Sequence, residues 1–223
     1  MSAAALNSFL LVFAGLLPIV NPPGSALLFL ALTRSGTRAQ RAQLARRIAT
    51  YAFFIMFVSL NVGAFVLQLF GISVPVLQVA GGVVLALAGW RALDAPQHRD
   101  DTPAPEAAQV GDLASMAFYP LTMPLTAGPG TVAVAIALGT GGSSAVGRPS
   151  MHLMAAGLGA LVATLTIAGL VYVCYRFADR IQEALGDSGS DALGRLFAFI
   201  LICIGIQILW TGFAALWMSL PPR

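Results

Sequence analysis

The sequence Pro124-Leu125-Thr126-Ala127-Gly128-Pro129-Gly130-Thr131 interrupts a long apolar stretch. An α-helix does not continue through two prolines and two glycines, because proline lacks the amide hydrogen and glycine disfavours helix. A second stretch of the same design is Pro18-Ile19-Val20-Asn21-Pro22-Pro23-Gly24-Ser25. Both contain a proline, four residues, Pro-Gly and then a hydroxyl residue. Paired interruptions in two halves of a membrane protein indicate a transporter binding site.

The composition places the chain in the membrane. Hydrophobic residues make up 58% of the 223 residues and charged residues only 9%, whereas soluble proteins have about 25% charged residues. A transmembrane helix needs about 20 apolar residues. The uncharged intervals permit six, at about 6–32, 48–70, 75–93, 113–139, 153–175 and 196–218. We therefore predict an all-α membrane protein with six transmembrane helices, of which the first and fourth are broken near the bilayer midplane.

Three helices in each half predict two inverted repeats, since an odd number of crossings starts the second half on the opposite side. The first repeat is predicted at 1–94, a cytoplasmic linker at 95–112 and the second repeat at 113–223. Small residues at 80–82 and at Gly205 indicate close helix packing in the third and sixth spans. Three further segments are expected: a tight reversal near Gly71, a flexible outer loop at 139–150 and an interfacial amphipathic segment at 177–193.

The distribution of arginine predicts the orientation. The first, third and fifth connections carry ten of the twelve arginines, and the other side carries only Arg148 and Arg223. Positively charged loops stay in the cytoplasm. Both termini are therefore expected outside the cell.

Each interruption is expected to end one helix and begin another. Asn21 and Gly128 are the predicted N-caps, with prolines at the first helical positions. The exposed amides that follow, and the positive end of the helix dipole, would attract a carboxylate. Amides were expected from Gly24, Ser25 and Ala26, and from Gly130, Thr131 and Val132. Freed carbonyls and hydroxyls would accept an ammonium group or Na⁺. The candidate substrate-binding residues are Asn21, Pro22, Pro23, Gly24, Ser25, Thr126, Gly128, Pro129, Gly130 and Thr131.

Several function classes find no support. The predicted spans contain no Asp, Glu or Lys, and their one arginine is Arg91 near the end of the third span, which argues against a buried carboxylate proton relay. They contain no nucleophile with a base nearby and no metal-ligand cluster, so we expect neither an enzyme nor a metal site or other cofactor. Coupling to Na⁺ or H⁺ remains open. The expected partners are a small polar substrate and the lipid bilayer, not nucleic acid, and a homo-oligomer is left open.

The chain resembles the MarC family of bacterial and archaeal inner-membrane proteins. The resemblance extends over the whole chain and is carried by the segments 18–22, 70–75, 80–82 and 120–131. It implies a six-span inverted-repeat fold and, as in the SnatA-type members, cation-coupled transport of small neutral amino acids such as glycine and alanine. Similarity in plan to LysE-type exporters keeps export of another small metabolite open. A non-transporting subunit of a membrane complex is the other alternative.

Overall fold

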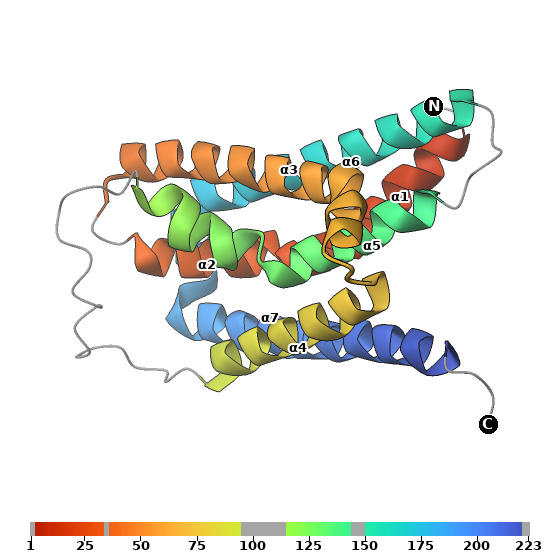
Figure 1. Ribbon diagram of the computed structural model, residues 1–223. Helices are drawn as coiled ribbons and strands as arrows, with labels where there is room; N and C mark the ends of the chain where they lie inside the picture. The colour runs from red at the N-terminus through yellow and green to blue at the C-terminus, as the bar shows by residue number, and fades with distance from the viewer. Residues whose placement is uncertain (1–2, 34–35, 95–114, 144–149, 220–223) are drawn as a thin grey trace.

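The computed structural model describes residues 3–33, 36–94, 115–143 and 150–219, all of them in helices or short turns. Figure 1 shows the arrangement of the helices. In chain order they are α1 (Ala3–Val20), α2 (Pro22–Leu32), α3 (Arg38–Leu69), α4 (Val74–Asp94), the 3₁₀ helix η1 (Ser115–Ala117), the π-helical η2 (Phe118–Thr126), α5 (Pro129–Ser143), α6 (Ser150–Arg176) and α7 (Ala178–Met218).

Five stretches are long and apolar enough to cross a membrane, and a bent pair brings the number to six. The five are Ala3–Leu32, Arg38–Leu69, Val74–Asp94, Met154–Arg176 and Gly189–Met218. The bent pair consists of Phe118–Thr126 and Pro129–Thr140, at an angle of 58°. The predicted all-helical membrane fold is therefore confirmed, and each candidate span overlaps one of the predicted uncharged intervals.

Two helices start earlier than hydropathy predicted. The second span was expected from about residue 48, but α3 begins at Arg38 and its N-cap Thr37 forms a capping box with Gln40. The last span was expected from about residue 196, but α7 begins at Ala178. Hydropathy detects the apolar part of a helix, whereas capping decides where the helix itself begins.

The connections agree with the predictions in part. α3 and α4 are joined by a tight reversal in which Gly71 has φ 65°, as expected near this residue. The predicted amphipathic segment forms the start of α7, which bends at Gly186 (φ 67°, ψ 175°) before it continues into the span. The predicted loop at 139–150 is wrong at its start, because α5 continues to Ser143. Residues 144–149 and the predicted linker 95–112 lie outside the described residues.

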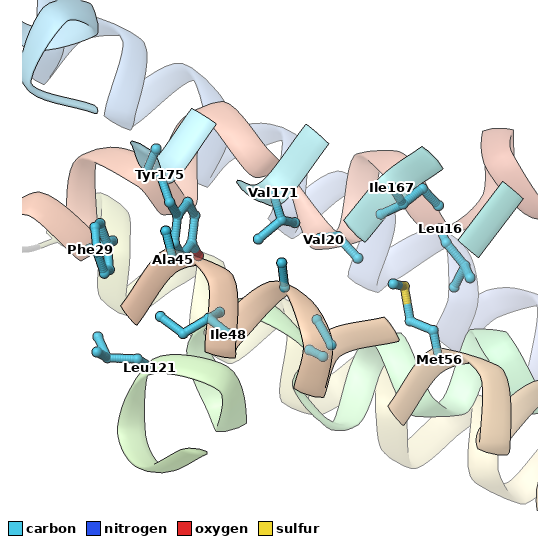
Figure 2. Packing of buried hydrophobic residues seen from close by; sticks show 14 of the residues in the cluster. Leu16, Val20, Phe29, Ala45, Ile48, Met56, Leu121, Ile167, Val171 and Tyr175 are labelled. Carbon is cyan, nitrogen blue, oxygen red and sulfur yellow. The ribbon is translucent and has the colours of Figure 1, made fainter. Parts of the chain in front are cut away.

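The main core is built by α1, α2, α3, η2 and α6. Figure 2 shows its buried side chains, among them Leu16, Ile48, Leu121, Val171 and Tyr175. The rings of Phe29 in α2 and Tyr175 in α6 stack with their centroids 4.6 Å apart. This core lies behind both interruptions and fixes α2, η2 and α6 against one another.

α4 and α7 pack mainly on each other and form a separate layer along one edge of the molecule (Figure 1). Glycines allow the close approach. A Cβ atom added to Gly82 would lie 2.6 Å from the carbonyl oxygen of Gly205, and one added to Gly205 would lie 2.8 Å from that of Gly82. Both contacts are too short for any side chain, so the predicted role of small residues in these two spans is confirmed.

Candidate functional site

The first interruption is a single residue, Asn21, between α1 and α2. Asn21 has left-handed backbone angles (φ 45°, ψ 62°), which asparagine tolerates better than most residues. Its side-chain oxygen accepts a hydrogen bond from the amide of Gly24 at 3.3 Å. Pro22 and Pro23 occupy the first two positions of α2 and have no amide hydrogen to satisfy. The predicted N-cap role of Asn21 is confirmed.

The start of α2 offers fewer free donors than expected. The amide of Gly24 is taken by the Asn21 side chain, and the amide of Ser25 donates to the Asn21 carbonyl at 2.9 Å. The expected approach of a ligand to Gly24 is also closed, because a Cβ atom there would meet the Asn21 side chain. The expectation of free amides at Gly24 and Ser25 is therefore wrong.

The second interruption is wider and leaves donors free. Ala127 and Gly128 separate η2 from α5, and the Gly128 carbonyl accepts the amide of Val132 at 3.1 Å. Val132 thus joins the helix, whereas the amides of Gly130 and Thr131 in the first turn donate to no other described residue. The start of α5 therefore presents two free amides.

Thr131 adds a third donor at this helix end. The residue is only 2% exposed, and its hydroxyl forms no hydrogen bond with the residues that the structure describes. The hydroxyl oxygen is not among the buried side-chain atoms that lack a partner in the described residues, so it is still accessible to a ligand. A polar ligand at the start of α5 would satisfy it.

Hydroxyl side chains at and near the interruptions donate to backbone carbonyls. Ser25 donates to the Val20 carbonyl at 3.0 Å, and Thr126 donates to the Leu121 carbonyl at 2.7 Å. Thr122 donates in the same way to the Ala117 carbonyl at 2.6 Å. In each pair the acceptor is five residues before the donor.

Tyr175 joins the two interruptions, and the sequence analysis did not identify it. Its phenol oxygen lies 2.7 Å from the hydroxyl oxygen of Thr126. Its ring stacks on Phe29 of α2, the helix that begins at the first interruption. One signal was available in the sequence, since Ala163, Ile167, Val171 and Tyr175 continue one buried stripe of α6 at four-residue spacing.

A cavity of about 460 Å³ brings the predicted residues together. Eight of the ten candidates line it: Asn21, Gly24, Ser25, Thr126, Gly128, Pro129, Gly130 and Thr131. Pro22 and Pro23 do not. α4 and α7 supply an apolar wall opposite, which consists of Val84, Leu85, Ala88, Phe197, Ala198 and Leu201.

One end of the cavity is polar. It is lined by Gln182, Ser190, Asp191 and Arg195 from the first part of α7. Asp191 and Arg195 are exposed and form no ion pair within the described part of the chain. Among the described residues that line the cavity, the formal charges thus lie at this end, and the interruptions contribute dipoles and hydroxyls.

Comparison with known proteins identifies a family and several relatives. It matches the family described as MarC family integral membrane protein over residues 6–217. It is 34% identical over 201 residues to the inner membrane protein MarC of Salmonella paratyphi A, covering 88% of this chain and 90% of the relative. The proteins of the same name from Citrobacter koseri and Escherichia coli O1:K1 are 33% and 34% identical over the same shares. No solved structure matches significantly.

Proposed function

This chain belongs to the MarC family of integral membrane proteins, and from that premise we propose that it is a secondary transporter of small neutral amino acids. It is a multi-pass membrane protein whose relatives are inner membrane proteins, and the bacterial inner membrane is its expected location. Transport proceeds by alternating access of a single site between the two interrupted spans.

The observation that carries this proposal is the meeting of both interruptions at one cavity with unsatisfied donors. Gly130 and Thr131 line the cavity, so that their free amides and the Thr131 hydroxyl are available to a ligand at the positive end of the α5 dipole. Such a helix end binds carboxylate groups, as in other transporters with broken helices. The Ser25 hydroxyl of the other interruption and the Thr126 hydroxyl line the same cavity, so that a zwitterion finds polar partners for both of its charged groups.

The cavity favours a small and uncharged side chain. Leu85 lies so close to the start of α5 that a Cβ atom on Gly130 would be 3.2 Å from it. The wall formed by α4 and α7 is apolar, and the charged residues Asp191 and Arg195 lie at the mouth. Glycine and alanine fit these conditions, whereas a charged side chain would meet no partner deep in the cavity.

The proposal includes an inverted repeat, which would supply two related halves that can exchange roles. The glycine contacts between α4 and α7 support this part of the proposal. A Cβ atom added to Gly82 would contact Leu209, four residues after Gly205, and one added to Gly205 would contact Ala86, four residues after Gly82. One added to Gly89 would contact Ala198, seven residues before Gly205, and one added to Gly212 would contact Pro75, seven residues before Gly82. A two-fold axis between Gly82 and Gly205 would produce this pattern.

Because the exposed residues Asp191 and Arg195 of the first part of α7 line the cavity, we infer that the described conformation is open towards this end of the bundle. This end carries most of the arginines and is the predicted cytoplasmic side. The other end is closed by tight contacts of α5, since an added Cβ atom on Gly139 would meet the Leu60 carbonyl and one on Gly63 would meet Ile136. We assign this conformation to the inward-open state of the transport cycle.

Transport into proteoliposomes tests the proposal. Purified protein should accumulate labelled glycine and L-alanine above the level of empty liposomes, with little uptake of leucine or lysine. Imposed Na⁺ and pH gradients identify the coupling ion, and Na⁺ suits a site of carbonyl and hydroxyl oxygens. Uptake that responds to neither gradient would replace coupling by facilitated diffusion or exchange. A lack of uptake and exchange for all amino acids tested would contradict the transporter assignment.

A further inference from the structure

The two sides of the cavity differ in whether they offer hydrogen-bond donors or acceptors to a ligand. At the start of α5, amides and the Thr131 hydroxyl are donors without partners. At the other side, Ser25 and Thr126 already donate to backbone carbonyls. A hydroxyl group has one hydrogen and two lone pairs. Once that hydrogen is used, only acceptor capacity remains for a ligand.

The Tyr175 phenol completes the assignment of the hydroxyl hydrogens. Because the single hydrogen of Thr126 is directed at the Leu121 carbonyl, the 2.7 Å contact with Tyr175 requires the phenol to donate. The hydrogens of Ser25, Thr126 and Tyr175 are then all used within the protein. Ser25 and Thr126 line the cavity, whereas Tyr175 lies behind them.

We propose that the hydroxyl oxygens of Ser25 and Thr126 form a subsite for a positively charged group, with Tyr175 as the positioning residue that holds Thr126. The subsite rests on the proposed function and gives the substrate a direction in the cavity. The carboxylate lies at the start of α5 and the positive charge at the hydroxyls.

Two groups share the chemistry of this subsite: the ammonium group of the substrate and a coupling cation. Both seek oxygen lone pairs, and an anion would be repelled by them. Thr126 and Ser25 are 1% and 7% exposed, so that a cation there is largely removed from water and depends on these oxygens. No carboxylate lies among the residues that line the inner part of the cavity.

The test separates the two ends of the substrate. Labelled L-alanine bound to the purified, full-length protein is displaced with propionate, which lacks the amino group, or with ethylamine, which lacks the carboxylate. Thr126→Val and Ser25→Ala should each weaken alanine and ethylamine binding about tenfold or more and leave propionate unchanged. Thr131→Val should show the reverse, with loss of alanine and propionate binding only.

Matched variants control for folding and for packing. Thr122→Val removes a hydroxyl with the same kind of carbonyl bond, in the same segment, but Thr122 does not line the cavity. It should leave all three ligands unchanged. Tyr175→Phe removes only the phenol oxygen and should weaken alanine and ethylamine severalfold without affecting propionate. All variants are compared after their melting temperatures confirm that they are folded.

The outcomes distinguish the two proposals. Loss of Na⁺-stimulated alanine binding in Thr126→Val, with ethylamine unchanged, would support the subsite with the coupling ion as its occupant. Equal loss of propionate and ethylamine binding would overturn the subsite while the transporter assignment stands. Unchanged binding of both ligands together with unchanged Na⁺-stimulated alanine binding would overturn it as well. If the wild-type protein binds no amino acid, the proposed function fails and the subsite with it.

Discussion

The phenol oxygen of Tyr175 lies 2.7 Å from the hydroxyl oxygen of Thr126, although the two residues are 49 positions apart in the sequence. Both side chains are almost completely buried. α6 thereby contacts the second interruption through a polar bond and the first through the stacked ring of Phe29. A helix with no interruption of its own thus fixes the relative positions of the two that are broken.

This bond should appear as an energetic coupling. We expect Tyr175→Phe and Thr126→Val each to destabilise the protein, and the double variant to be more stable than additivity predicts by about 1 kcal/mol. Unfolding of the four proteins in the same detergent measures the coupling. Additive effects would show that the two hydroxyls do not interact in solution.

Substitutions at the start of α5 should weaken substrate binding to different degrees. Thr131→Ala removes one hydrogen bond to a charged group and should raise the Kd for alanine about ten- to 150-fold. Gly130→Val should abolish binding, because its branched side chain fills the space between α5 and Leu85. Calorimetry on monodisperse protein measures the alanine affinity of both variants. Gly24→Val is unsuited to the same comparison, since its side chain would displace the Asn21 cap rather than the ligand.

Wild-type affinity in Gly130→Val would contradict the site at the start of α5. The interruption would then serve packing alone, and a substrate would have to bind elsewhere in the molecule.

The α4–α7 layer should be sensitive to single methyl groups. Gly82→Ala and Gly205→Ala place a Cβ atom within 2.6 Å and 2.8 Å of a backbone oxygen, so each should destabilise the protein by about 1 to 3 kcal/mol. Gly169→Ala is the matched control, because no atom lies within 4 Å of its added Cβ. Its melting temperature should equal or exceed that of the wild type. Equal effects at all three positions would mean that α4 and α7 are not closely packed.

The orientation can be measured with single cysteines in a variant that lacks Cys174 and Cys203. An impermeant thiol reagent should label Ser143→Cys in intact cells and should label Thr102→Cys only after lysis, because the arginines favour the cytoplasm. The reverse pattern would place both termini in the cytoplasm. The cavity of the described conformation would then open to the outside.

Much of the fold could be predicted because a membrane limits the alternatives. Spans follow from apolar length, and the breaks follow from prolines that cannot donate. The cap at Asn21 was predictable from its place before two prolines. The start of α3 was missed because Arg38 to Arg47 were assigned to a loop, although Thr37 and Gln40 have capping-box spacing.

The site was predictable as a set of residues but not as a set of hydrogen bonds. Both interruptions were identified, yet the capture of the Gly24 amide by the Asn21 side chain depends on local backbone angles that no motif states. Tyr175 depends on the packing of α6 against η2 and α2, which is a long-range contact. The apolar wall of the cavity likewise comes from α4 and α7, which no local pattern connects with the breaks.

Gly71 and Gly186 are placed where they could act as hinges of the α4–α7 layer. They are the two described glycines with positive φ, and each lies where the chain passes from the main core into the α4–α7 layer. Before Gly186, the first turns of α7 are tied to α3 by the ion pair of Arg41 and Asp179 at 2.8 Å. At each of the two glycines the α4–α7 layer is therefore connected to a part of the chain that is held in the main core. Changes in the backbone torsion angles at these two hinges would rotate the layer as a rigid body and change the width of the cavity beneath it.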